Sequence, residues 1–226
     1  VIRAMFEEGV KMAAVYGKDN VYDFSLGNPN VPAPDCVKQA ILDIINEEDP
    51  VMVHGYMPNA GYVDVRTAVA DSLNRRFGMD YGPENILMTV GAASGLNDIL
   101  KTILNPGDQV LTFAPFFVEY SSYVKNYDGE LVVVPPDTST FQPDLEEFEK
   151  RINHRTKAVI VNNPNNPTGV VYSEETIRRM AGVLERKSRE IGHPIVLISD
   201  EPYRELVYDG VQVPYIPKFY KDTVVV

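Results

Sequence analysis

Short runs of continuously apolar residues, separated by longer amphipathic segments, constrain this chain more than any other feature of its sequence. Each run has four or five residues and is rich in valine and isoleucine, which is typical of β-strands. Because the runs do not alternate with polar residues, we expect both faces of each strand to be buried. The pattern predicts an α/β protein with a mainly parallel sheet and helices on both faces. The expected strands are 86–90, 109–113, 131–134, 158–161, 195–198 and 223–226.

The segments before and between these runs have the periodicity of amphipathic helices. Ser173 precedes Glu174 and Glu175, so its hydroxyl can cap free amides while the carboxylates oppose the positive end of a helix. Gly78 is placed to end another helix. The expected helices are 2–16, 37–45, 65–77, 96–104, 118–127, 145–152 and 173–190.

The stretch from Phe24 to Pro34 divides the chain. Its three prolines and one glycine are incompatible with a regular element. We therefore expect residues 1–34 to form an N-terminal helix and connecting segment, and residues 35–226 to form one large domain. Because the first residue is Val1 rather than methionine, we expect the true N-terminus, with any targeting segment, to lie outside this sequence.

Charge and cysteine content argue against several classes of function. An excess of 32 acidic over 21 basic residues gives a net charge of −11, which repels phosphate backbones and anionic membranes. We expect neither nucleic acid nor membrane as a partner, and no apolar run approaches the roughly 20 residues of a membrane span. Cys36 is a single cysteine and the three histidines lie far apart, so we expect neither a disulfide nor a metal site. This composition suits a cytoplasmic protein.

Ligands of parallel α/β sheets bind beyond the carboxyl ends of the strands, so the residues that follow each strand are candidate site residues. They form a small-residue helix start at 91–95, an aromatic segment at 114–117, an amide-rich turn at 162–169 and a carboxylate at Asp200. Small residues at a helix start leave free amides that favour an anion such as phosphate. Each of the four also has an ordinary structural explanation, so no single one decides the function.

In this order and spacing, the segments resemble the large domain of the class I and II aminotransferases, which are fold-type-I enzymes that use pyridoxal 5'-phosphate. The resemblance extends over nearly the whole chain. It implies that residues 1–34 belong to the small domain and residues 35–226 to the cofactor-binding large domain, incomplete at its C-terminus. The matching motifs are NNPNNPTG at 162–169 and SDEPY at 199–203, supported by SLGNP at 25–29, HGYMPNAGY at 54–62 and TVGAASGL at 89–96.

The resemblance assigns roles around the ring of the cofactor. Asp200 matches the aspartate that faces the pyridine nitrogen and keeps it protonated, so that the ring accepts electrons from the substrate. Asn166 and Tyr203 match residues that hydrogen-bond the phenolic oxygen of the ring. Phe117 matches the aromatic side chain stacked on its face.

Other roles concern the phosphate, the substrate and the partner subunit. Ala92 and Ala93 match positions whose backbone amides hold the phosphate, and Ser94 matches a position whose hydroxyl contacts it. Tyr56 matches a tyrosine that reaches the phosphate bound by the neighbouring subunit, which implies a homodimer. Gly27 matches a glycine whose backbone lies against the substrate carboxylate.

The lysine that forms a Schiff base with the cofactor in this family would follow the strand at 223–226, so we expect it beyond Val226. Lys218 and Lys221 precede that strand, and we interpret them as surface charges at the opposite edge of the sheet. The arginine that binds the substrate carboxylate would also lie beyond Val226. We therefore expect the 226-residue chain alone to be inactive and its last strand to expose an apolar edge.

The leading hypothesis is an aminotransferase that moves an amino group between an L-amino acid and a 2-oxo acid. A carbon–sulfur lyase or an enzyme similar to aminocyclopropane-carboxylate synthase would fit the same scaffold. A non-catalytic, aminotransferase-like ligand-sensing domain is a further alternative. Nicotinamide, P-loop and serine-hydrolase functions are disfavoured because GxGxxG, GxxxxGK[ST] and GxSxG are absent from the sequence.

Overall fold

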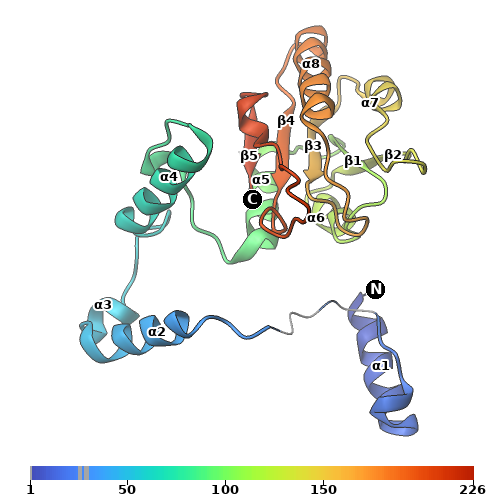
Figure 1. Ribbon diagram of the computed structural model, residues 1–226. Helices are drawn as coiled ribbons and strands as arrows, with labels where there is room; N and C mark the ends of the chain where they lie inside the picture. Colours follow the sequence, from blue (N-terminus) through green and yellow to red (C-terminus); the bar gives the residue numbers. More distant parts are fainter. Residues whose placement is uncertain (1, 25–26, 28–30) are drawn as a thin grey trace. The chain divides into compact units, whose positions relative to one another are not determined.

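The computed structural model in Figure 1 describes residues 2–24, 27 and 31–226. Its residues cluster into two compact units, residues 1–57 and residues 58–226, and each unit is described by itself. The boundary predicted at residue 34 concerns the small and large domains of the whole protein. The two units do not test it, so it stays a prediction.

The first unit consists of helices. Two of them agree with the predicted helices at 2–16 and 37–45, and the short third helix was not predicted. Asp49 begins that third helix, because its carboxylate accepts a hydrogen bond from the Val51 amide at 2.7 Å. The elements are α1 (Ile2–Tyr16), η1 (Lys18–Asn20), α2 (Asp35–Glu47) and α3 (Pro50–His54).

The α-helices of the second unit agree with the predicted ones within two residues at each end, except that α5 begins at Gly91 rather than at residue 96. The short helices η2 and η3 were not predicted. Ser173 caps the longest of them by accepting a hydrogen bond from the Thr176 amide at 3.0 Å. Gly78 ends another in the left-handed conformation, with φ 63°, which glycine adopts without strain. The elements are α4 (Val63–Phe77), η2 (Pro83–Asn85), α5 (Gly91–Ile103), α6 (Tyr120–Lys125), α7 (Leu145–Arg151), α8 (Glu174–Ile191) and η3 (Ile216–Lys218).

Five strands of the second unit form one sheet in the order β2-β1-β3-β4-β5, and all of their pairings are parallel. In the register of β3 with β4, Asn162 lies opposite Asp200. The predicted parallel α/β sheet is therefore confirmed. The strands are β1 (Gln109–Phe113), β2 (Glu130–Val134), β3 (Thr156–Asn162), β4 (Val196–Asp200) and β5 (Thr223–Val225).

The strand predicted at 86–90 is wrong. This segment runs without regular structure between η2 and α5, and its Met88 amide donates to the Ala60 carbonyl at 3.0 Å. A strand needs a neighbouring strand for its ladder of hydrogen bonds, and the described part of the chain places none beside this segment. Its valine and isoleucine content therefore does not produce a strand here.

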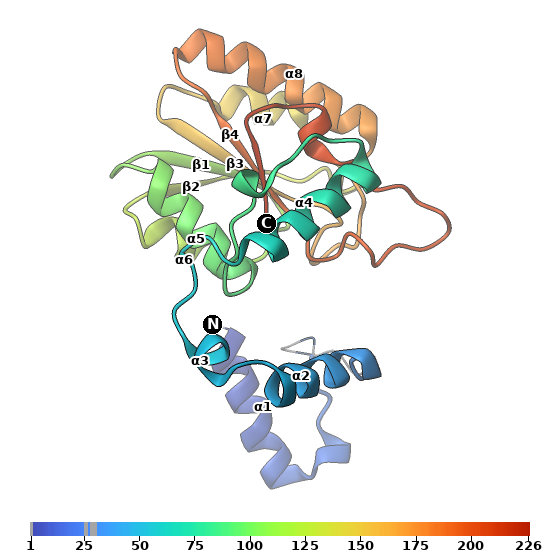
Figure 2. The ribbon, with the colours of Figure 1, turned by 90° about the vertical axis from the view of Figure 1, so that its left-hand side faces the viewer.

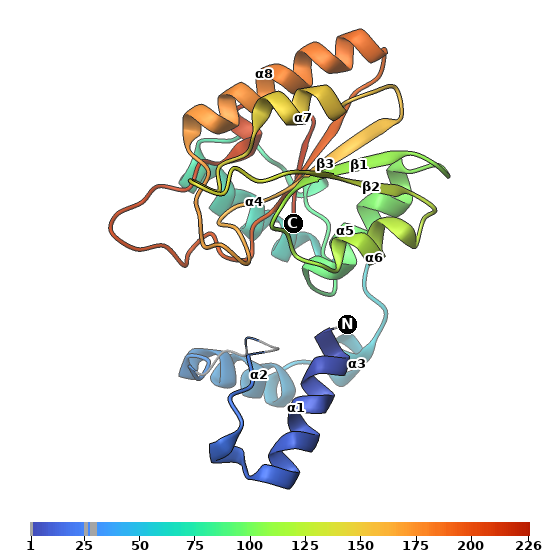
Figure 3. The ribbon, with the colours of Figure 1, turned by 90° about the vertical axis from the view of Figure 1, so that its right-hand side faces the viewer.

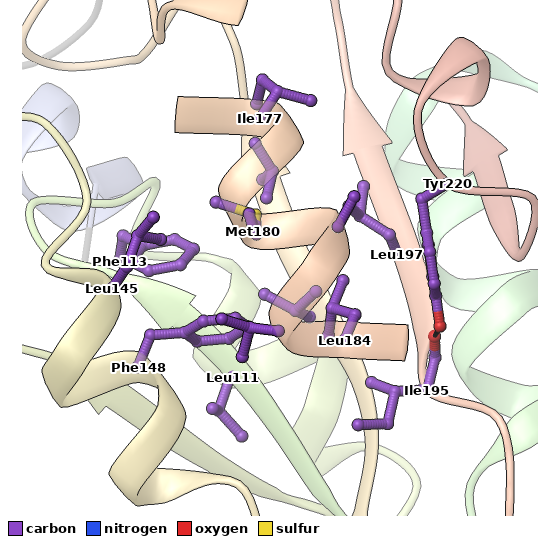
Figure 4. Packing of buried hydrophobic residues seen from close by; sticks show 14 of the residues in the cluster. Leu111, Phe113, Leu145, Phe148, Ile177, Met180, Leu184, Ile195, Leu197 and Tyr220 are labelled. Carbon is purple, nitrogen blue, oxygen red and sulfur yellow. Dashed lines mark hydrogen bonds between the residues drawn. The ribbon is translucent and has the colours of Figure 1, made fainter. Parts of the chain in front are cut away.

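Helices cover both faces of the sheet, as predicted. In Figures 2 and 3, α7 and α8 lie on one side of the strands, and α5 and α6 lie on the other. Successive residues of β3 point to opposite faces, so Val159 and Val161 pack under α7 and α8, whereas Ala158 and Ile160 pack under α5 and α6. Figure 4 shows the first of these cores, which includes Leu111, Phe148, Met180 and Leu197.

Candidate active site

The carboxyl ends of β3 and β4 bring polar groups together at one edge of the sheet. Asn162 and Asp200 are the last residues of these strands. The Asn162 side-chain amide donates to the Asp200 carbonyl at 3.0 Å, and the Asn163 backbone amide donates to the same oxygen at 3.3 Å. The turn that follows β3 is therefore fixed to the residue that carries the carboxylate.

The Asp200 side chain is buried, with 6% of the residue exposed. Its Oδ2 accepts a hydrogen bond from the Tyr120 hydroxyl, whereas its Oδ1 has no partner among the described residues. Burial raises the pKa of the Asp200 carboxyl; the Tyr120 hydrogen bond opposes this rise and the charge of Glu201 adds to it. An unpaired buried acceptor is costly, so Oδ1 is a site for a hydrogen-bond donor.

Tyr120 is a site residue that the sequence did not single out. It is fully buried at the start of α6, and burial together with the Asp200 charge raises the pKa of its hydroxyl, which therefore keeps its proton and donates. Phe117 lies three positions before it, a helical spacing that could have drawn attention to it. Its pairing with Asp200, 80 residues away, follows only from the fold.

Asn166 and Tyr203 meet at the same edge. The Asn166 Nδ2 donates to the Tyr203 hydroxyl at 3.2 Å, and the Asn166 backbone amide donates to Asn162 Oδ1 at 2.6 Å. Asn165 stabilises the turn internally by accepting from the Thr168 hydroxyl at 2.7 Å. The side chains of Asn166 and Tyr203 are half-buried, so their remaining hydrogen-bonding groups are accessible to a ligand.

Phe117 follows β1 and contacts the residue that binds Asp200. Its ring lies edge-on to the Tyr120 ring, with 5.7 Å between centroids, and its side chain is half-buried. The structure therefore connects Phe117 to Asp200 through a single intervening side chain.

The start of α5 lies close to the ends of β4 and β5. A Cβ atom on Gly95 would be 3.0 Å from Val226 Cγ1, which is tighter than ordinary van der Waals contact. Val226 donates to the Ser199 carbonyl and accepts from the Glu201 amide, both at 2.9 Å, on either side of Asp200. Gly91 begins the helix at φ 78°, and the first turn carries Ala92, Ala93 and Ser94 with no acidic residue.

Gly27 and Tyr56 lie in the first unit and are described within that unit alone. A Cβ on Gly27 would meet no atom within 4 Å, and Tyr56 is fully exposed just after α3. Gly27 is the one residue of the SLGNP motif among the described residues.

Lys218 and Lys221 lie where the sequence placed them. Both are exposed and precede β5, whose first residue, Thr223, pairs with Leu197 near the amino end of β4. Asp200 closes the carboxyl end of that strand, so the lysines lie at the opposite edge of the sheet. The described residues contain no group of side chains able to hold a metal ion and no helix suited to crossing a membrane.

The comparisons with known proteins agree with this architecture. The family described as "Aminotransferase class I and II" matches residues 19–224, and the chain belongs to this family. A "Probable aspartate/prephenate aminotransferase" of Thermus aquaticus is 38% identical over 186 residues, which cover 81% of this chain and 46% of the relative. The chain spans about half the length of the curated relatives it matches.

Two solved structures illustrate the likeness of the fold. An amino transferase from Eubacterium rectale is 47% identical with a TM-score of 0.95, and the match covers 100% of this chain and 57% of the other. Aspartate aminotransferase from Thermus thermophilus, in a structure with maleate, is 29% identical with a TM-score of 0.84, covering 99% of this chain and 56% of the other.

Proposed function

We propose that this chain is about half of an aminotransferase that uses pyridoxal 5'-phosphate to move an amino group between an L-amino acid and a 2-oxo acid. Family membership and the names of the curated relatives support the reaction class. The single observation that carries the proposal is the buried Asp200 carboxylate, which has one oxygen held by Tyr120 and the other without a partner.

The residues at the sheet edge fit the proposed cofactor. A protonated pyridine nitrogen is a donor that would complete the hydrogen bonding of Asp200 Oδ1. Its positive charge would also offset the burial that raises the pKa of the carboxyl. The Tyr120 hydroxyl fixes the other oxygen, so the carboxylate is oriented before the cofactor binds.

When bound, the cofactor supplies an electron-withdrawing ring that stabilises negative charge at the substrate α-carbon. Asp200 would keep the proton on the ring nitrogen. Asn166 and Tyr203 would hydrogen-bond the phenolic oxygen, and Phe117 would pack against the ring.

The start of α5 is the proposed phosphate site, with the amides of Ala92 and Ala93 and the hydroxyl of Ser94 as donors. The helix dipole contributes about 0.3 to 2 kcal/mol, whereas micromolar binding needs about 8 kcal/mol. Phosphate binding at α5 therefore has to combine with the contacts at Asp200 and Phe117.

The remaining assignments concern the whole protein. Gly27 is proposed to place its backbone against the substrate carboxylate. Tyr56 is proposed to reach the phosphate bound by a second subunit, so that a homodimer shares its two sites. The small domain at 1–34, which the motif resemblance supports, and a cytoplasmic location, which suits the single cysteine, complete the proposal.

Binding of pyridoxamine 5'-phosphate to the 226-residue chain tests the proposal, because this form of the cofactor needs no lysine. We expect Asp200→Asn to weaken binding, measured by equilibrium dialysis, about 10- to 100-fold, the effect of losing a charged hydrogen bond. Asp222→Asn makes the same chemical change at the opposite edge of the sheet and serves as the control. The absence of binding to the wild-type chain, or equal binding by Asp200→Asn, would contradict the proposal.

A further inference from the structure

Arg204 follows Tyr203 directly in the chain, and its side chain donates hydrogen bonds to three residues in two segments, Glu201 and the neighbouring pair Val213 and Pro214. Its Nε donates to Glu201 Oε2, one terminal nitrogen donates to the Val213 carbonyl at 3.0 Å, and the other donates to the Pro214 carbonyl at 3.1 Å. We propose that Arg204 is a positioning residue that holds the 201–215 loop so that the Tyr203 hydroxyl meets Asn166. This inference rests on the proposed function, in which Tyr203 and Asn166 bind the phenolic oxygen of the cofactor.

The side chains of the Arg204–Glu201 ion pair are largely buried, unlike those of most ion pairs among the described residues. The side chains of Arg204 and Glu201 are 11% and 6% exposed, whereas the Arg76–Glu205 pair nearby has side chains 46% and 72% exposed. Removing one partner of a buried pair leaves an uncompensated charge, so the geometry of the pair is strongly maintained. Surface pairs contribute little by comparison.

Two aromatic rings lie beside the guanidinium. The rings of Phe77 and Tyr215 stack with 4.1 Å between centroids, and the Arg204 guanidinium carbon lies 5.1 Å from the first centroid and 5.3 Å from the second. Phe77 ends α4, while Tyr215 directly precedes η3. Arg204 therefore fixes its own loop to a helix and to the far end of that loop.

Glu201 connects this cluster to the strand that carries Asp200. Its Oε1 accepts from the Ser199 hydroxyl at 2.6 Å, and its backbone amide donates to the Val226 carbonyl at 2.9 Å. Through Glu201, the guanidinium is thus connected to the residues on both sides of Asp200.

The loop needs such an anchor because it contains no regular element between β4 and η3. Leu206 and Tyr208 beyond Arg204 are 63% and 78% exposed, so apolar burial does not fix this part of the loop. The turn at Tyr203 has one backbone bond on each side, from the Arg204 amide to Glu201 at 3.2 Å and from the Leu206 amide to Tyr203 at 2.9 Å. The three-way contact of Arg204 therefore determines where Tyr203 lies.

The geometry of the guanidinium, more than its charge, carries this role. Its planar group donates to one carboxylate and two backbone carbonyls at the same time. A lysine ammonium on a flexible chain does not reach all three acceptors in this arrangement. A lysine at this position would keep the charge opposite Glu201 and lose the contacts to Val213 and Pro214.

Nuclear magnetic resonance of the unliganded chain tests the proposal without cofactor. The side-chain amide signals of Asn166, identified by their loss in Asn166→Ala, report its hydrogen bond to Tyr203. We expect Arg204→Met to shift these signals in the same direction as Tyr203→Phe, and Arg204→Lys to shift them partly. Arg76→Met, which removes an arginine stacked on the same Phe77 ring at 4.9 Å, is the matched control and should leave them in place.

Cofactor binding separates positioning from a general loss of stability. We expect Arg204→Met to weaken pyridoxamine 5'-phosphate binding about 3- to 10-fold, the effect of one hydrogen bond. In a Tyr203→Phe background the same change should cost less than about 2-fold, because coupled residues are not additive.

Each outcome decides the proposal. Unchanged Asn166 signals in Arg204→Met, or in Arg204→Lys if the methionine variant does not fold, would overturn it, as would equal losses of affinity with and without the Tyr203 hydroxyl. A wild-type chain that binds no pyridoxamine 5'-phosphate would refute the proposed function, and the Asn166 signals would still decide the role of Arg204.

Discussion

The Asp200 carboxylate is buried with one oxygen unpaired among the described residues, an arrangement that destabilises the unliganded chain and leaves an acceptor for a ligand. A buried carboxylate with one oxygen unpaired costs free energy, and the raised pKa of Asp200 expresses that cost. The Tyr120 hydroxyl reduces the cost without removing it, because it satisfies Oδ2 alone. Removing this hydroxyl should therefore destabilise the ionised form of Asp200 most.

We expect Tyr120→Phe to lower the free energy of unfolding by about 1 to 3 kcal/mol when Asp200 is ionised. The hydroxyl lowers the pKa of Asp200 against the effect of burial, so the variant's folded state has a still higher pKa and binds its proton more tightly. The variant's loss of stability relative to wild type should thus grow as the pH rises through the folded-state pKa values of Asp200 in the two proteins. Both of these pKa values lie above the ordinary carboxyl value of about 3.9. Urea unfolding at about pH 4 and about pH 8 measures this difference.

Tyr123→Phe is the control for this measurement. It removes a hydroxyl from the same helix, but that hydroxyl donates to the exposed Glu119 at 2.6 Å. An exposed bond contributes at most about 1 kcal/mol. An equal loss in Tyr120→Phe at both pH values would show that the hydroxyl does not act on the charge of Asp200.

Single residues differed in how far the sequence could predict them. Asp200, Asn166 and Tyr203 belong to motifs, and the structure brings Asn166 and Tyr203 into contact and ties the turn of Asn166 to the Asp200 backbone. Tyr120 and Arg204 were not predicted, because their roles depend on contacts with residues that only the folded loops bring near them. A local pattern of residue types does not predict such contacts.

Among the elements, α8 tests how well a local signal predicts structure. Ser173 was predicted to begin this helix, and its hydroxyl accepts from the Thr176 amide at 3.0 Å. We expect Ser173→Ala to lower the free energy of unfolding by about 1 kcal/mol, because an amide of the first turn loses its acceptor. Urea unfolding measures the loss.

Ser121→Ala, at an exposed position inside α6, is the control for the cap. Alanine is the better helix former there, so this variant should be as stable as wild type or up to about 0.5 kcal/mol more stable. A loss as large as that of Ser173→Ala would show that the effect does not come from the cap.

Whether a segment forms a strand depends on distant partners, and this is where the sequence produced a false prediction. The strands at β1, β3 and β4 have partners on both sides, and their apolar runs predicted them within two residues at each end. The segment 86–90 has an equally apolar composition and no strand beside it in the described structure. Composition therefore predicts which segments can be strands, and the neighbours decide which of them are.

At the scale of the molecule, the buried residues are concentrated in one unit. Both hydrophobic cores lie within residues 58–226, on the two faces of the sheet. Within the described part of residues 1–57, no residue is buried, and α1 and α2 expose Phe6, Val10, Ile41 and Ile45. Since apolar burial is the main source of stability, the second unit should hold nearly all the stability of this chain.

Hydrogen exchange of the 226-residue chain should reveal this difference. We expect the amides of α1, α2 and α3 to exchange at least about 100-fold faster than those of β1, β3 and β4, because the helices open locally whereas the central strands open with the whole core. Equal protection in both units at every chain concentration would contradict this expectation. Protection of α1 and α2 that disappears on tenfold dilution would instead assign their exposed apolar side chains to contacts between chains.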